Sequence, residues 1–219
     1  MHAAGIVAAA GSGLRLGADL PKALVPLAGR PLVCWAVDAL RAGGVADVVV
    51  AVPADERAAF AAALGPDVVL VDGGASRTAS VRAALSVVTD AEAVLVHDAA
   101  RPLTPPDVVA RVLAALAAGA PAVVPVLPVV DTTVLVDDDG TVTATPDRSA
   151  LRRVQTPQGF SRVVLEKAYG ELPVDEELTD DAAVVRAHGV PVSTVAGDER
   201  AAKVTVPHDL ALAELQVRA

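Results

Sequence analysis

Short apolar runs and longer helical patterns alternate along most of this 219-residue chain. The apolar runs have the length and the Val-, Ile- and Leu-rich composition of buried strands. Strands are expected at residues 6–10, 45–52, 68–71, 94–97, 120–126 and 190–195. Helices are expected at residues 31–43, 54–64, 76–88, 105–118, 161–171 and 179–189, with a last helix near the C-terminus. This order predicts an α/β fold, a Rossmann-like and mostly parallel sheet flanked by helices, with right-handed crossovers.

One segment breaks this alternation. Residues 129–136 and 141–145 are two β-rich runs around an Asp-Gly pair, and this pattern predicts a hairpin. A lone hairpin is marginal in water, so this one is expected to pack on something else. We therefore predict a single domain over residues 1–219, in which residues 129–148 form a dimerisation arm that crosses to the second subunit of a homodimer.

The overall charge and hydropathy exclude several classes of protein. A net charge of −9 argues against general nucleic-acid binding. No apolar run approaches the roughly 20 residues of a membrane span, and the N-terminus lacks the pattern of a signal peptide. The single cysteine, Cys34, allows no internal disulfide and fits a reducing compartment, so a cytoplasmic location is expected. Cys34 lies in an apolar helical pattern and is expected to be buried.

Aromatic residues and lysines are both scarce. Aromatic residues make up only 2% of the chain, so a bound nucleobase could not be recognised mainly by stacking. Backbone groups and small hydroxyl side chains would have to recognise it instead. Of 18 basic residues only Lys22, Lys167 and Lys203 are lysines. Because an ammonium group is a compact charge suited to one oxygen, the placement of these few lysines is informative.

A glycine-rich loop follows the first expected strand. Gly11, Gly13 and Gly17 allow backbone N–H groups to approach an anion, since no Cβ atom blocks the way. Arg15 and Lys22 add positive charge to the same stretch. Glycine-rich backbone with two cations is suited to a polyphosphate, although the spacing alone leaves open a plain turn with two solvated cations.

Two better-known phosphate loops do not fit this stretch. The P-loop pattern requires a lysine after its last glycine, and Ala18 stands there. The dinucleotide fingerprint requires a third glycine where Leu16 stands, which disfavours a dehydrogenase.

Two further loops follow expected strands and should meet the first at the carboxyl edge of the sheet. In one, Gly73 and Gly74 permit close backbone approach, and Ser76 is a suitable helix N-cap. In the other, His97 and Asp98 end a strand and are expected to point into the crevice. Asp98 could hold a divalent cation directly or through water, and an Asx turn is the alternative.

The amino-acid sequences of these loops also resemble those of a known protein family. A-A-G-x-G-x-R-x-G-x-x-x-P-K-x-x-x-P-L-x-G-x-P, beginning at Ala9, resembles the signature loop of the sugar-phosphate nucleotidyltransferases, which wraps the triphosphate of an incoming nucleotide. V-D-G-G-x-x-R-x-x-S-V at 71–81, H-D-A-A-R-P at 97–102 and T-P-Q-G-F at 156–160 narrow the resemblance. The chain is similar, over essentially its whole length, to the 2-C-methyl-D-erythritol 4-phosphate cytidylyltransferase family of the non-mevalonate isoprenoid pathway.

The resemblance implies roles for individual residues. Arg15 and Lys22 would be catalytic. CTP would be bound by Ala9, Ala10, Gly11, Gly13, Gly74, Ala75, Ser80, Asp98 and Ala99. The sugar phosphate would be bound by Arg101, Thr132, Arg148, Thr156, Thr179, Asp180 and Lys203. Mg²⁺ would be the cofactor, with Asp98 as a candidate ligand, and in this family the arm at 129–148 reaches over the partner subunit.

Some positions favour a structural reading or depart from the family. Thr179 is expected to cap a helix, and two acidic residues follow it in the first turn. Favourable interaction with the helix N-terminus is a sufficient explanation for Asp181. Arg152 and Arg153 are read as solvated surface. The family usually has Asn where this chain has Ala201, so a side-chain hydrogen bond at that position is lost.

The implied reaction transfers CMP from CTP to 2-C-methyl-D-erythritol 4-phosphate and releases pyrophosphate. Ribitol-5-phosphate cytidylyltransferase is an alternative of the same class, because it shares the H-D-A-A-R-P string. A non-catalytic nucleotide-binding regulator is an alternative of another class. The joint presence of Arg15, Lys22, Asp98 and Lys203 argues against the regulator.

Overall fold

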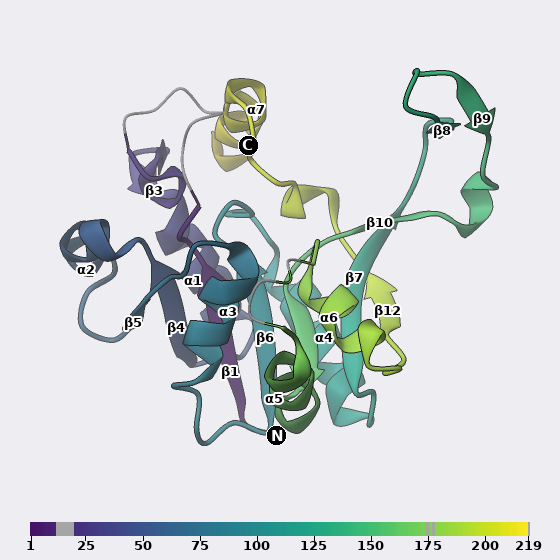
Figure 1. Ribbon diagram of the computed structural model, residues 1–219. Helices are drawn as coiled ribbons and strands as arrows, with labels where there is room; N and C mark the ends of the chain where they lie inside the picture. Colours follow the sequence, from purple (N-terminus) through teal and green to yellow (C-terminus); the bar gives the residue numbers. More distant parts are fainter. Residues whose placement is uncertain (12–19, 174–175, 177, 219) are drawn as a thin grey trace.

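The computed structural model describes residues 1–11, 20–173, 176 and 178–218, and its centre is one twisted sheet (Figure 1). The strand order across the sheet is β5, β4, β1, β6, β11, β7, and β7 also pairs with β10 and β12. The parallel strands are β1 (Ala3–Ala8), β4 (Asp47–Val52), β5 (Val69–Asp72), β6 (Ala93–Asp98), β7 (Ala122–Pro128) and β12 (Ser193–Ala196). The antiparallel strands are β10 (Arg152–Val154) and β11 (Gln158–Ser161).

Helices cover both faces of the sheet, and the residues of each strand alternate between them. Val7 and Leu95 face one core with α1 (Leu32–Ala42), α2 (Arg57–Leu64) and α4 (Pro106–Ala117). Ile6 and Val96 face the other with α3 (Arg77–Leu85), α5 (Arg162–Glu171) and α6 (Asp181–Ala187). All six residues of β6 are buried, as expected for a central strand covered on both faces.

A smaller apolar cluster lies beside the main sheet. The antiparallel pair β2 (Pro26–Leu27) and β3 (Arg30–Pro31) contributes Leu27 to it. The C-terminal helix α7 (Pro207–Arg218) contributes Ala213, and the two elements are in contact. Short 3-10 helices lie at Lys22–Leu24, Ala54–Glu56, Arg148–Ala150 and Glu199–Ala201. The packing of α7 on β2 places the C-terminal helix beside this small antiparallel pair (Figure 1).

The predicted fold class is confirmed, with corrections to single elements. The first strand runs from Ala3 to Ala8 and not from 6 to 10, because its pairing with β6 begins at Ala3 opposite Ala93. The expected helix 54–64 is a 3-10 turn followed by α2. Strands β2, β3, β10 and β11 were not predicted. Cys34 is buried, as expected.

The helix α6 begins differently from the prediction. The side chain of Asp180 accepts a hydrogen bond of 2.8 Å from the backbone N–H of Ala183, so Asp180 is the N-cap. The sequence predicts Thr179 in that place, but Thr179 lies one residue before the cap. The two acids therefore have different positions, with Asp180 at the cap and Asp181 at the first helical residue.

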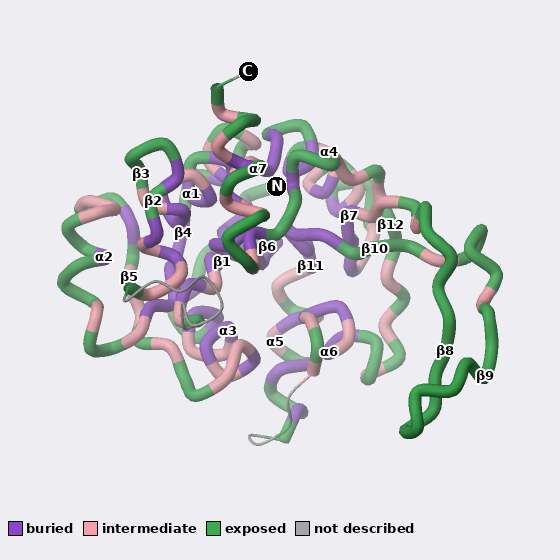
Figure 2. The backbone as a smooth tube through the Cα atoms, turned by 90° about the horizontal axis from the view of Figure 1, so that it is seen from above, coloured by how far each residue is buried: buried purple, intermediate pink, exposed green. Residues whose placement is uncertain are grey.

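The predicted hairpin is confirmed and stands away from the rest of the chain (Figures 1 and 2). It consists of β8 (Leu135–Val136) and β9 (Val142–Ala144), which form a sheet of their own. Val130, Leu135, Val136 and Val142 are between 55% and 65% exposed. Apolar side chains in such numbers on a protruding hairpin are suited to contact with another surface, so the homodimer stays a prediction.

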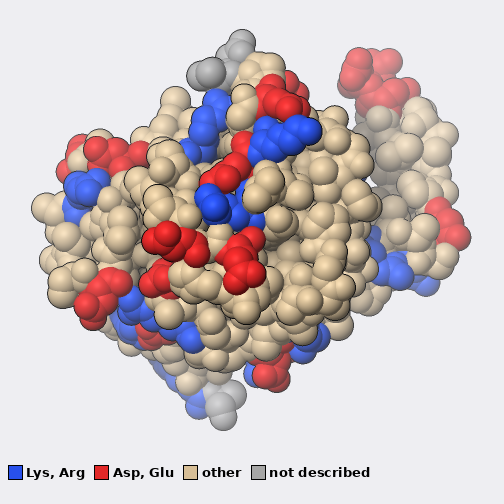
Figure 3. All heavy atoms as spheres, turned by 90° about the horizontal axis from the view of Figure 1, so that it is seen from below, with Lys and Arg blue, Asp and Glu red and all other residues tan. Residues whose placement is uncertain are grey.

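Acidic and basic side chains are interspersed on the face shown in Figure 3. None of the helices within the described residues combines the length and the apolar character of a membrane span.

Candidate functional site

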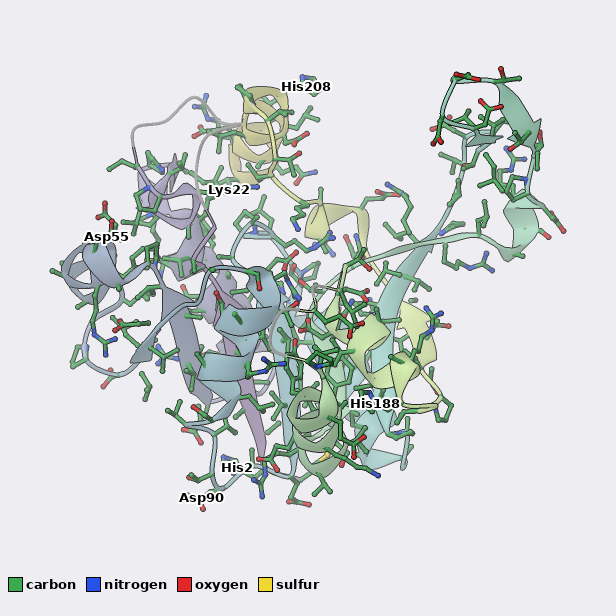
Figure 4. The ribbon with its side chains drawn as sticks, in the orientation of Figure 1. His2, Lys22, Asp55, Asp90, His188 and His208 are labelled. Carbon is green, nitrogen blue, oxygen red and sulfur yellow. The ribbon has the colours of Figure 1, made fainter. Side chains whose placement is uncertain are left out.

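A pocket of about 560 Å³ opens where the loops after β1, β5 and β6 meet, at the carboxyl ends of the strands. Lys22 projects at this end of the sheet, below α7 (Figure 4). The pocket is lined by Ala8, Ala9, Ala10, Gly11, Lys22, Ala23, Gly74, Ala75, Ser76, Arg77, Ser80, Asp98, Ala99, Ala100 and Lys203. The described parts of the three loops singled out in the sequence therefore line one pocket.

The loop after β5 is built from residues that leave no room for larger side chains. A Cβ atom on Gly74 would lie 2.4 Å from the Cβ of Ala79. The backbone N–H of Gly74 donates to Ser80 Oγ at 3.1 Å, and that hydroxyl donates to the backbone carbonyl of Ser76 at 2.8 Å. Ser76 also caps α3, as predicted, by accepting from the backbone N–H of Ala79 at 3.1 Å. These contacts make a narrow wall of backbone and small side chains.

The carboxylate of Asp98 forms ion pairs with three basic side chains. Its carboxylate lies 2.8 Å from Lys203 Nζ, 3.2 Å from Arg77 Nε and 3.8 Å from Arg101 Nε. Burial alone would raise the pKa of Asp98, but Arg77, Lys203 and Arg101 more than offset it, so the pKa lies well below its ordinary value. Asp98 is therefore a carboxylate at neutral pH, although it is only 7% exposed.

His97 does not point into the crevice, contrary to the prediction. It is fully buried, because neighbouring residues of a strand point to opposite faces and Asp98 takes the pocket side. The Nδ1 atom of His97 lies 2.8 Å from Thr156 Oγ1, which also accepts a hydrogen bond of 3.1 Å from the backbone N–H of Asp98. Burial lowers the pKa of His97 to about 4, so the imidazole is neutral at physiological pH.

Arg77 is a pocket residue that the sequence analysis did not assign. Its Nη2 donates to Asp181 Oδ2 at 2.7 Å, and its Nε donates to Asp98 Oδ1 at 3.2 Å. The other oxygen of Asp181 accepts a hydrogen bond of 2.6 Å from the hydroxyl of Tyr169. Asp181 is completely buried, so the role of an acid in the first turn of α6 is not sufficient for it. The arginine of the V-D-G-G-x-x-R-x-x-S-V string was the available signal for Arg77.

The structure brings most of the predicted nucleotide site together. The predicted CTP-binding residues that line the pocket are Ala9, Ala10, Gly11, Gly74, Ala75, Ser80, Asp98 and Ala99. The predicted catalytic Lys22 and the predicted substrate residue Lys203 line it too. Gly13 and Arg15 lie outside the described residues.

Two predicted substrate residues lie behind the pocket wall. Arg101 Nη1 donates to the backbone carbonyl of Ala201 at 2.7 Å, and its Nη2 donates to that of Val154 at 3.4 Å. Thr156 is buried, with its hydroxyl between His97 and Asp98. Both residues therefore support Asp98 within the protein. Ala201 contributes its backbone carbonyl to this arrangement, a role that requires no side-chain amide.

Other predicted substrate residues are not brought to the pocket of their own chain. Arg148 Nη1 donates to the backbone carbonyl of Val130 at 2.6 Å, at the base of the protruding arm. Thr132 is exposed on the same arm. Thr179 lies before α6, and the cap Asp180 accepts a hydrogen bond of 2.8 Å from Gln158 Nε2.

Arg152 and Arg153 are exposed, as expected. Arg153 pairs with Glu199 at 2.7 Å on the surface, so neither arginine is drawn into the pocket.

The described residues contain no group of three or more His, Cys, Asp or Glu side chains that could hold a metal ion by itself. Asp98 nevertheless fits the way Mg²⁺ is usually bound, by one or two carboxylates together with substrate phosphates and water. Its carboxylate faces the pocket and is ionised.

The buried neutral state of His97 predicts that the protein loses stability in mild acid. The pKa of His97 is about 4 in the folded chain, below the ordinary 6.5, so between these values the unfolded chain binds a proton that the folded chain does not. Stability should therefore fall as the pH drops from 6.5 to 4, by up to about 3 kcal/mol from this group. Urea unfolding of the wild type and of His97→Gln at about pH 7 and about pH 4.5 measures this contribution. Equal losses in the two proteins would contradict it.

The chain matches known proteins in sequence and in structure. The family model of 2-C-methyl-D-erythritol 4-phosphate cytidylyltransferase matches residues 3–219. A protein of that name from Nocardia farcinica is 54% identical over 212 residues, which are 95% of this chain and 91% of that protein. The crystal structure of a 2-C-methyl-D-erythritol 4-phosphate cytidylyltransferase from Thermus thermophilus is 39% identical, covers 100% of both chains and gives a TM-score of 0.83. That of a 4-diphosphocytidyl-2C-methyl-D-erythritol synthase from Anaerococcus prevotii is 25% identical, covers 100% of this chain and 99% of that chain, and gives a TM-score of 0.86. The chain belongs to the 2-C-methyl-D-erythritol 4-phosphate cytidylyltransferase family.

Proposed function

We propose that the pocket binds CTP and transfers CMP to 2-C-methyl-D-erythritol 4-phosphate, giving 4-diphosphocytidyl-2-C-methyl-D-erythritol and pyrophosphate. The chain is a cytidylyltransferase, a nucleotidyltransferase of isoprenoid synthesis. The observation that carries the assignment of the reaction to this pocket is its composition. Glycine and alanine backbone from the loops after β1 and β5 meets Lys22, Lys203 and Asp98 in one cavity.

The chemistry requires charge neutralisation and no general base. A phosphate oxygen of the sugar phosphate forms a bond to the α-phosphorus of CTP, while the bond from that phosphorus to the oxygen of the leaving pyrophosphate breaks. The attacking oxygen is already ionised near neutral pH, so no proton has to be removed. The barrier is the approach of two anions and the charge that gathers on the oxygens around the phosphorus. Positioning and cationic side chains must therefore supply most of the catalysis.

We assign a separate role in binding or catalysis to each of the charged residues. Lys22, together with Arg15, would stabilise the charge around the α-phosphorus. Lys203 would attract the sugar phosphate, since its ammonium lies at the pocket wall beside Asp98. Asp98 would help to hold Mg²⁺, which supplies charge neutralisation on the triphosphate when bound. The loop after β5 would recognise cytosine by backbone and hydroxyl groups, because no aromatic side chain is among the residues lining the described part of the pocket.

We also propose a homodimer in which each arm completes the partner's pocket. Arg148 and Thr132 lie on the arm and not at the pocket of their own chain, and the arm exposes apolar side chains. A two-fold arrangement would cover these side chains and bring Arg148 to a second active site. The single buried cysteine supports a reducing, cytoplasmic location.

The substrate assignment predicts a strong preference for CTP and for one sugar phosphate. A narrow wall of backbone and small side chains should exclude a purine by size. Pyrophosphate release is measured with CTP or ATP, each with 2-C-methyl-D-erythritol 4-phosphate or ribitol 5-phosphate. The expected result is turnover only with CTP and the methylerythritol phosphate. Equal rates with ATP and CTP, or faster turnover of ribitol 5-phosphate, would refute the assignment.

Replacement of Lys22 should abolish most turnover without unfolding the protein. Loss of one group that stabilises charge in the transition state typically costs about 10²–10³ in rate, and this is the loss expected for kcat of Lys22→Ala. Lys167→Ala is the matched control, since Lys167 is exposed on α5 and pairs only weakly, at 4.0 Å, with Glu171. Near-normal kcat in folded Lys22→Ala protein would remove Lys22 from the mechanism.

The crossed arm predicts complementation between two inactive variants. Lys22→Ala and Arg148→Ala subunits are unfolded and refolded together. In a mixed dimer one site carries both lesions, and the other combines an intact Lys22 with an intact Arg148 from the second subunit. Random pairing makes half of the dimers mixed, so about a quarter of wild-type activity should return. No recovery despite confirmed subunit exchange would mean that Arg148 serves its own chain.

A further inference from the structure

A chain of four polar side chains connects the pocket with the interior behind it. The hydroxyl of Tyr169 donates to Asp181 Oδ1 at 2.6 Å, and Arg77 Nη2 donates to Asp181 Oδ2 at 2.7 Å. Arg77 Nε then donates to Asp98 Oδ1 at 3.2 Å. These residues, Tyr169, Asp181, Arg77 and Asp98, are called the buried relay below. It joins α5 and α6 to the end of the central strand β6 through the first residue of α3.

The burial of Asp181 is costly and needs a reason. Asp181 has no exposed surface, and a buried carboxylate is strongly unfavourable unless its partners compensate the loss of water. Both of its oxygens do have partners, Tyr169 on one and Arg77 on the other. An acid that served only the N-terminus of α6 could remain at the surface, where Asp180 already caps the helix. The position of Asp181 is therefore best explained by what it does to Arg77.

Arg77 lies between two carboxylates that have different surroundings. Asp181 is sealed in the core, whereas Asp98 lines the pocket. The guanidinium is planar, so fixing Nη2 on Asp181 also fixes the direction in which Nε points. That direction is toward Asp98 Oδ1, while Asp98 Oδ2 is left to Lys203 at 2.8 Å. The orientation of the Asp98 carboxylate therefore depends on an anchor on the far side of Arg77.

We propose that Asp181 and Tyr169 are positioning residues, which hold Arg77 so that it presents the Asp98 carboxylate to the nucleotide. This inference depends on the proposed function, in which the pocket binds CTP. Tyr169 has the smaller part, since it orients Asp181 through a single hydrogen bond. Asp181 has the larger part, since its charge balances that of Arg77 and keeps the guanidinium from turning toward the phosphates.

The test compares variants that cut the relay with one that only loosens the same helix. Tyr169→Phe removes one hydroxyl and keeps the ring, and Asp181→Asn removes the charge and keeps the shape. Val184→Ala is the control, because Val184 is 1% exposed on α6 and takes no part in the relay. For each protein the melting temperature, the Kd for CTP, and kcat and KM for both substrates are measured.

Small displacements of a positioned group can lower a rate strongly, so kcat/KM for CTP should fall about tenfold in Asp181→Asn and about threefold in Tyr169→Phe. Val184→Ala should lower the melting temperature and leave kcat/KM near that of the wild type. If Asp181→Asn does not fold, Tyr169→Phe still decides the matter. Unchanged kcat/KM and Kd in folded Tyr169→Phe protein would overturn the proposal.

A double-mutant cycle separates positioning from a general structural effect. Arg77→Lys cuts the relay, since one ammonium cannot span both carboxylates as the guanidinium does. Tyr169→Phe should then cause no further loss of kcat/KM in the Arg77→Lys background, whereas a structural effect would add to it. Additive losses would overturn the relay while leaving the proposed function intact. A wild type that binds no CTP would instead overturn the proposed function, and this inference with it.

Discussion

The arrangement of the pocket depends on the negative charge of Asp98. It sits nearly buried at the end of the central strand β6, where an unpaired carboxylate would be strongly unfavourable. The compensating cations come from separate parts of the chain: Arg77 begins α3, Arg101 follows β6, and Lys203 precedes α7. Keeping this one charge in the fold therefore fixes the relative positions of the segments that carry these cations, and two of them, Arg77 and Lys203, line the pocket together with Asp98.

Two uncharged groups behind Asp98 make this arrangement possible. His97 is fully buried, and its burial disfavours the protonated imidazole more than the neighbouring Asp98 carboxylate favours it. Thr156 bonds both the ring of His97 and the backbone of Asp98. Thr156 precedes β11, the antiparallel strand inserted between β6 and β7. The break in the parallel order of the sheet thus supplies the group that holds the end of β6.

The sequence alone predicted what rests on local pattern and missed what rests on distant partners. Alternating apolar runs predicted the parallel strands and the helices around them. The pairing of 152–154 and 158–161 with β7 and β6 was missed, because this stretch contains Pro157, Gly159 and several polar residues and has no strand-like alternation. Asp181 was interpreted only as an acid in the first turn of its own helix, because its partners Arg77 and Tyr169 become its neighbours only in the folded chain. The placement of His97 was wrong because the register of β6 decides which of two adjacent residues faces the pocket.

The arm exposes apolar side chains to water, and the pocket receives no cation from the arm of its own chain. Contact between two chains would resolve both. Exposed valine and leucine side chains on a two-stranded hairpin cost roughly 25 cal/mol for each Å² that stays in water, and open strand edges invite unwanted pairing. The pocket, for its part, has Lys203 at its wall, and the arm of the same chain brings no second cation to it. A contact between two chains that buries the arm would also bring Arg148 to a phosphate. If the proposed dimer forms, assembly would be a condition of substrate binding, because the exposed apolar side chains and Arg148 lie on the same short stretch of chain.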